Sequence, residues 1–198
     1  MLATGCRVSE ALALEWRDVN ALSHQIRIEK SMDIDGTVKA PKSDAGTRTN
    51  TIDADTFESL VRLYRFQAEA FGKLGLCDAD GRLAPDAPVF AANNAARVDY
   101  ANLGRWWGTW RKAHGFDGLL FHELRYTQVT HLLDKGIPLK TVQARVGHAD
   151  AKTTLDCYAR PVSGRDADAA AVMESLFDGD DETAAFDASK VIPLKRAI

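Results

Sequence analysis

The chain has 198 residues, of which 45% are hydrophobic and 27% are charged, and its formal net charge is −3. This size and composition fit one globular domain and exclude collagen-like, coiled-coil and wholly disordered proteins. No stretch approaches the roughly 20 uninterrupted apolar residues of a membrane span. The N-terminus lacks the pattern of a secretory signal, and the three widely spaced cysteines fit a reducing compartment. We therefore expect a cytoplasmic protein with no membrane partner.

The first quarter of the chain predicts a short helix followed by a small antiparallel sheet. Ser9 can cap the helix, and apolar residues continue as far as Val19. Three strand-like runs follow at 24–29, 37–40 and 47–52, and turn-forming residues separate them. This spacing is typical of a three-stranded antiparallel meander.

The rest of the chain has a mainly helical pattern. Apolar residues recur at helical spacing from Asp55 or Thr56 to Phe71, and a loop rich in Asp, Gly and Pro covers about 75–90. Further helices are predicted, in chain order, at 100–112, 121–134, 139–146, 152–158 and about 165–177. The expected fold class is therefore α+β, mainly α-helical, with a small three-stranded antiparallel sheet.

The negative charge is concentrated at the C-terminus. Residues 161–198 hold four Lys or Arg and eight Asp or Glu, so residues 1–160 carry a net charge of +1. Residues 178–198 are acidic and rich in alanine, and we expect them to be a disordered tail. Total charge gives no support for nucleic-acid binding, so that function has to be argued from motifs.

Six residues spread along the chain are together suited to one reaction. In chain order they are Arg7, Lys42, His122, Arg125, His148 and Tyr158. A tyrosine hydroxyl attacks phosphorus reversibly once guanidinium groups neutralise the phosphate and hold its non-bridging oxygens. Histidines can donate hydrogen bonds or accept the tyrosine proton, and a lysine can protonate the leaving hydroxyl. The set favours covalent phosphoryl transfer through a phosphotyrosine, with no metal and no cofactor.

The motifs around these residues resemble the catalytic domain of the tyrosine recombinase, or phage integrase, family. In order they are LATGCRVSE at 2–10, PKS at 41–43, HELR at 122–125 and VGHA at 146–149, followed by Tyr158. Glu123 stands where the family commonly has Asp. The resemblance implies that Glu10 supports the first catalytic arginine. It implies catalytic roles for Arg7, Lys42, His122, Arg125 and His148, with Tyr158 as the nucleophile.

The same resemblance implies a function and an organisation. It implies site-specific breakage and rejoining of double-stranded DNA through a 3′-phosphotyrosine intermediate, by a homotetramer assembled on DNA, sometimes with accessory DNA-bending proteins. Family members carry one or two helices, and usually a DNA-clamping domain, before the first motif. Residues 1–177 are therefore expected to be an N-terminally truncated catalytic domain.

Three points stay open from the sequence. Lys30 and Lys39 compete with Lys42 for the role of the catalytic lysine. Residues 137–158 also fit a helix-turn-helix, so a non-catalytic DNA-binding regulator is an alternative function. An inactive integrase remnant that has kept the residues is another.

Overall fold

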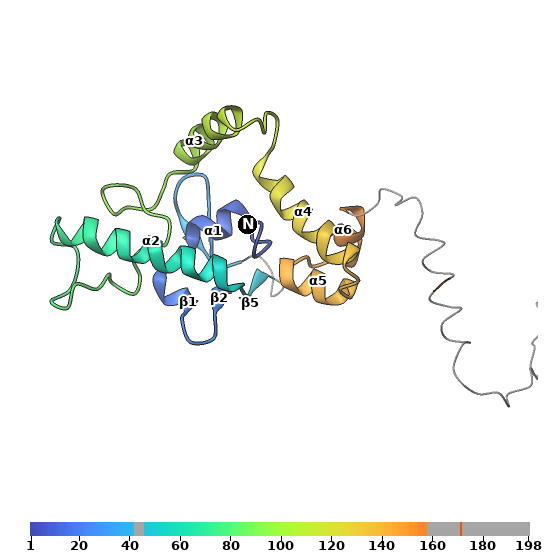
Figure 1. Ribbon diagram of the computed structural model, residues 1–198, viewed down its shortest axis with the longest axis horizontal. Coiled ribbons are helices and arrows are strands. Elements are labelled where there is room, and N and C mark those ends of the chain that lie inside the picture. Colours follow the sequence, from blue (N-terminus) through green and yellow to red (C-terminus); the bar gives the residue numbers. More distant parts are fainter. Residues whose placement is uncertain (42–45, 158–170, 172–198) are drawn as a thin grey trace, which may run out of the picture. The chain divides into compact units, whose positions relative to one another are not determined.

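The computed structural model describes residues 1–41, 46–157 and 171 (Figure 1). The helices, including the 3₁₀ helix η1, are α1 (Val8–Ala13), η1 (Trp16–Asp18), α2 (Ala54–Gly72), α3 (Tyr100–Ala113), α4 (Phe121–Asp134), α5 (Leu139–Val146) and α6 (Ala151–Asp156). The strands are β1 (Val19–Asn20), β2 (Gln25–Ile28), β3 (Ser31–Met32), β4 (Val38–Lys39) and β5 (Arg48–Thr51). The predicted fold class, mainly helical with a three-stranded antiparallel sheet, is confirmed.

The composition of the sheet differs from the prediction. Its order is β1-β2-β5, and β2 pairs with β5 along four residues, with Ile26 opposite Asn50. The segment expected to be its middle strand, 37–40, instead contains β4, which pairs with β3 in a separate two-stranded sheet. A turn from Asp33 to Thr37 closes that hairpin. The meander prediction was wrong because strands that follow each other in sequence do not have to pair.

The start of α1 also differs from the prediction. The residue that caps the helix is Arg7, and the backbone N–H of Arg7 donates to the Glu10 carboxylate at 2.8 Å. A carboxylate at the third helical position can take this role in place of a capping serine. Glu10 therefore orders the turn that carries Arg7.

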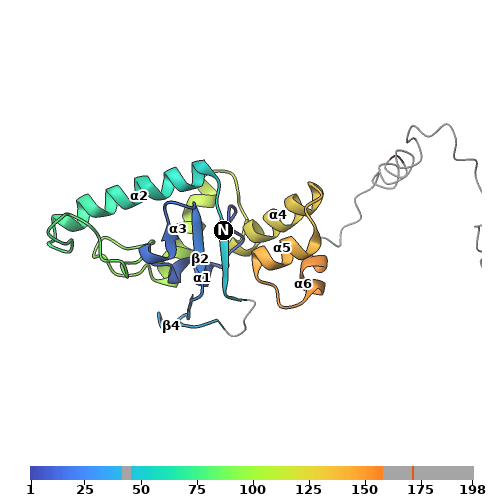
Figure 2. The same ribbon diagram turned by 90° about the horizontal axis from the view of Figure 1, so that it is seen from below.

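Two of the three apolar clusters among the described residues pack helices against the sheet or against each other. One packs the buried Ile26 and Ile28 of β2 and Leu14 against partly buried residues of α2, including Leu60. The other lies between α4 and α5, where Val129, Val142 and Val146 are fully buried. Both views show α4, α5 and α6 beside one another, next to β5 (Figures 1 and 2).

Two polar side chains join the helices α4–α6 to the sheet. The buried Asn50 amide donates to the carbonyl oxygens of Thr4, at 2.7 Å, and Arg145, at 2.9 Å. The Arg145 guanidinium donates to the carbonyls of Ala3 and Thr51. These bonds tie the N-terminal segment, β5 and the end of α5 together, so each can position side chains in a shared site.

Gly5 lies where these segments meet, and an added side chain there is expected to be costly. Its φ is +65°, and a Cβ would lie 2.1 Å from Gln128 Oε1 and 2.7 Å from Val146 Cγ1. The Gln128 amide could rotate away, but Val146 is fully buried. Gly5→Ala should lower the free energy of unfolding by about 2–5 kcal/mol, combining left-handed backbone strain with overpacking.

Gly75→Ala is the matched control, because Gly75 has a φ of +71° and nothing within 4 Å of an added Cβ. It should cost only the backbone strain, about 1–2 kcal/mol. Urea denaturation of both variants measures the difference. Equal losses would contradict the close approach at Gly5.

Within the described part of the chain, no helix is long and apolar enough to cross a membrane.

Candidate active site

Arg7 is fixed at one end and open to solvent at the other. Its Nη1 forms an ion pair with Glu10 Oε1 at 2.7 Å, and its Nη2 lies 3.4 Å from the carbonyl oxygen of Gly147. The Arg7 side chain is 47% exposed, whereas that of Glu10 is 6% exposed. The guanidinium is thus held in place and still accessible to an anion.

Arg48 binds the other oxygen of the same carboxylate, although it is not among the six residues that the motifs predict for the site. Its Nη2 lies 2.7 Å from Glu10 Oε2, and its Nη1 and Nε donate to the carbonyls of Gly46 and Arg145. Burial alone would raise the pKa of Glu10, but the hydrogen bonds and charge of Arg48 and the hydrogen bonds of Arg7 outweigh it and keep the pKa below its ordinary value. Glu10 therefore stays ionised between two arginines.

Arg125 contributes a buried guanidinium from α4. Its Nη1 donates to the carbonyl of Gly5, and its Nη2 is buried without an acceptor among the described residues. Burial, and next the charge of Arg7, lower its pKa to about 10, so it stays protonated at neutral pH. A buried cationic donor without a partner is costly. An anion bound between Arg7 and Arg125 would satisfy it.

His148 follows the turn that ends α5. Gly147 adopts the left-handed conformation there, with a φ of 71°, and ends the helix. His148 is buried, and its Nδ1 lies 2.9 Å from Thr154 Oγ1. Burial, followed by the charges of Arg125 and Arg7, lowers its pKa to about 4. The imidazole is therefore neutral at physiological pH.

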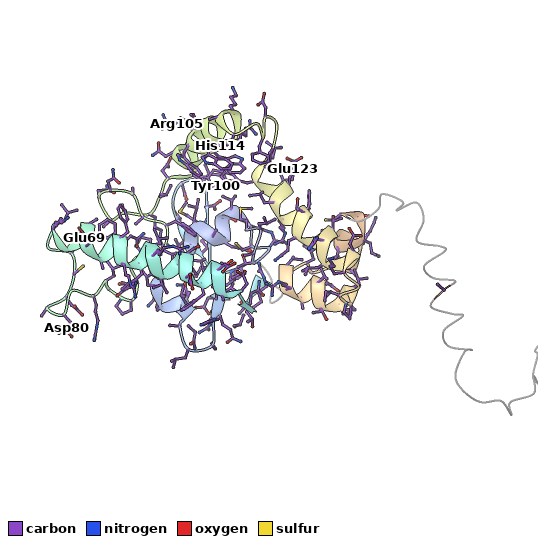
Figure 3. The ribbon with its side chains drawn as sticks, in the orientation of Figure 1. Glu69, Asp80, Tyr100, Arg105, His114 and Glu123 are labelled. Atoms are coloured by element: carbon purple, nitrogen blue, oxygen red, sulfur yellow. The ribbon has the colours of Figure 1, made fainter. Side chains whose placement is uncertain are left out.

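His122 lies on α4 one turn before Arg125, with its side chain exposed. Its ring packs edge to face against Tyr126, with ring centroids 5.3 Å apart. The next residue, Glu123, labelled in Figure 3, accepts the backbone N–H of Leu120 and caps the helix. The carboxylate at this position thus orders the first turn of α4, which carries His122.

The predicted Lys42 and Tyr158 lie outside the described residues. Pro41 and Gly46, which flank residues 42–45 in the sequence, line a cavity of about 350 Å³ together with Arg7 and Glu10. Of the two competing lysines, Lys30 is paired with the carboxylates of Glu15 and Asp18, and Lys39 is paired with Asp33.

In the part of the chain that the structure describes, Glu10 binds Arg7 and Arg48, and Arg125 and His148 lie close enough to feel the charges of all three. No group of three or more His, Cys, Asp or Glu side chains among those residues is arranged to hold a metal ion. Two fixed guanidiniums and a neutral imidazole form a site suited to a phosphate group, and one of the guanidiniums carries a buried donor without an acceptor among the described residues.

The sequence matches a protein-family model and is similar to several curated proteins. A model of the phage integrase family matches residues 1–164. The ICEBs1 integrase of Bacillus subtilis is 30% identical over 159 residues, which cover 78% of this chain and 41% of that protein. A XerC-like tyrosine recombinase of Caldanaerobacter subterraneus is 26% identical over 189 residues, covering 88% of this chain and 47% of that protein. The chain thus spans less than half the length of these two relatives.

Comparisons of structure show that the chain shares its fold with several solved proteins. The Tn1549 transposon integrase, solved in complex with circular intermediate DNA, matches with a TM-score of 0.66 and 22% identity, over 88% of this chain and 57% of that one. The XerA recombinase matches with a TM-score of 0.58 and 22% identity, over 89% of this chain and 54% of that one. XerH bound to its difH substrate also gives 0.58, at 22% identity, over 87% of this chain and 44% of that one.

Proposed function

The chain belongs to the phage integrase family, and from that membership we propose that it breaks and rejoins double-stranded DNA at a specific site. The reaction proceeds through a covalent 3′-phosphotyrosyl link on Tyr158. Relatives of this chain are tyrosine recombinases, and solved proteins of the same fold include an integrase and a recombinase bound to DNA.

The observation that carries the proposal is the convergence of Arg7 and Arg125. One guanidinium is anchored by a buried carboxylate and open to solvent, and the other holds a buried donor without an acceptor among the described residues. A phosphodiester placed between them would have its non-bridging oxygens bound from two sides. Both cations would stabilise the extra negative charge of a pentacoordinate transition state.

The remaining residues complete the reaction. The Tyr158 oxygen forms a bond to phosphorus, the bond from phosphorus to the 5′ oxygen breaks, and Lys42 delivers a proton to that oxygen. His148, neutral at physiological pH, donates a hydrogen bond to the phosphate. His122, exposed one turn before Arg125, accepts the proton of Tyr158. A 5′-hydroxyl of another strand then attacks the phosphotyrosine and rejoins the DNA.

We extend the proposal to the assembly. Exchange of strands between two duplexes requires several active sites, so the working form is a homotetramer on DNA, in the cytoplasm, aided at some sites by DNA-bending proteins. Residues 1–177 form the catalytic domain in this proposal, and residues 178–198 are an acidic tail.

The test is covalent capture of DNA by the protein. Nicked duplexes tiled across the DNA that flanks its own gene serve as probes, at low ionic strength because salt weakens phosphate contacts. We expect an adduct that survives SDS, forms in EDTA and carries the phosphate on Tyr158 in peptide mass spectrometry. An adduct on Cys157, an absolute need for Mg²⁺, or no adduct with any duplex would overturn the proposal.

A further inference from the structure

We infer that Thr154 is a positioning residue, whose hydroxyl donates to His148 Nδ1 and keeps the imidazole proton on Nε2, where it can bind the phosphate. This inference rests on the proposed function for its catalytic consequence. Its structural part stands on the contact between the two side chains.

The contact lies in a buried setting. Thr154 has no exposed surface, and His148 is 6% exposed. Thr154 is the buried residue of α6, whose N-terminus is capped by the Asp150 side chain. The loop between α5 and α6 therefore folds back so that α6 places one hydroxyl against the imidazole, 2.9 Å from Nδ1.

The direction of the hydrogen bond follows from the partners available to the hydroxyl and to the ring nitrogen. A threonine hydroxyl has one proton, and His148 Nδ1 is its partner among the described residues. If Nδ1 carried the proton and donated to Oγ1, the hydroxyl proton would have no acceptor in that part of the chain. A buried donor without an acceptor is costly. The arrangement with Thr154 as the donor avoids that cost.

Burial and the charges around His148 keep its imidazole neutral, so the position of the single ring proton decides which nitrogen can donate a hydrogen bond. Arg125, Arg7 and Arg48 disfavour a second proton on the ring, and Glu10 only partly opposes them. With burial acting in the same direction, the ring holds one proton at neutral pH, on either Nδ1 or Nε2. Only the Nε2–H form presents a donor to a phosphate held by the arginines. The other form would direct a lone pair toward its oxygens.

The experiment compares three variants of the protein. Thr154→Val keeps the shape of the side chain and removes the hydroxyl, whereas Thr154→Ser keeps the hydroxyl. Thr153→Val is the control, because Thr153 is the exposed neighbour on the same helix. We expect Thr154→Val to lower the single-turnover cleavage rate about tenfold, the size of one neutral hydrogen bond, with the DNA dissociation constant unchanged. Thr154→Ser and Thr153→Val should stay near the wild-type rate.

A second measurement tests the inference independently of the proposed function. Nitrogen-15 NMR of the His148 imidazole at pH 7 should show the Nε2–H tautomer in the wild type and a mixture in Thr154→Val. An Nδ1–H tautomer in the wild type, or a tautomer unchanged by Thr154→Val, would overturn the inference. If no variant cleaves DNA but the tautomer shifts as expected, the positioning role holds and the proposed function fails.

Discussion

Tyr158→Phe is expected to abolish covalent attachment to DNA while leaving the DNA dissociation constant nearly unchanged. The substitution removes only the nucleophilic oxygen, and without that oxygen no phosphotyrosine can form. Binding should persist because phosphate contacts dominate DNA affinity, and Arg7 and Arg125, which we propose to make them at the cleavage site, are untouched. The measurements are adduct formation on SDS gels and fluorescence anisotropy of labelled duplex.

The adjacent Cys157 provides the control. Its Sγ donates to the Thr153 carbonyl at 3.0 Å, and burial raises the pKa of the thiol. A thiol held protonated is a poor nucleophile. Cys157→Ser should therefore form the adduct as the wild type does. Loss of the adduct in Cys157→Ser, with retention in Tyr158→Phe, would assign the nucleophile to the cysteine.

The helices near the site could be predicted because their boundaries are set locally. The sequence places helices at 121–134 and 139–146, and these are the bounds of α4 and α5. A glycine or proline marks the boundaries between them, and such residues act within a turn or two. The sheet could not be predicted in the same way, since β2 and β5 pair across about twenty intervening residues.

The candidate site residues also differ in whether their contacts are local or distant in the sequence. The ion pair of Arg7 with Glu10 spans one helical turn, so the motif itself indicates it. The pairing of Arg48 with Glu10 spans 38 residues, and nothing in the sequence marks Arg48 as buried. An arginine facing inward from a strand requires a carboxylate or carbonyl partner, but a sequence pattern does not reveal which one.

Several features expected from the sequence remain predictions. Lys42, Tyr158 and the acidic tail fall outside the described residues, and so does the helix at about 165–177 apart from residue 171. The family model ends at residue 164, so the domain boundary at 177 also stays a prediction.

Arg125→Lys should lower the cleavage rate by about 10²- to 10³-fold, the loss typical of removing one preorganised donor to a developing charge. The guanidinium binds the Gly5 carbonyl through Nη1, and its Nη2 is buried without an acceptor among the described residues, where we propose that it binds the phosphate. A lysine has one ammonium group and cannot do both in the same plane. Charge is conserved, so a fall in rate at saturating DNA measures the loss of geometry.

Arg145→Lys separates this effect from a loss of structure. Arg145 also donates to backbone carbonyls, at Ala3 and Thr51, and burial lowers its pKa as well, yet it holds no orphaned buried donor. Its replacement should lower the melting temperature but change the rate of the folded protein less than tenfold. If both variants lost rate only in proportion to stability, Arg125 would be a structural arginine. A rate loss confined to Arg125→Lys, in a protein that still melts cooperatively, would require the guanidinium to act on the phosphate itself.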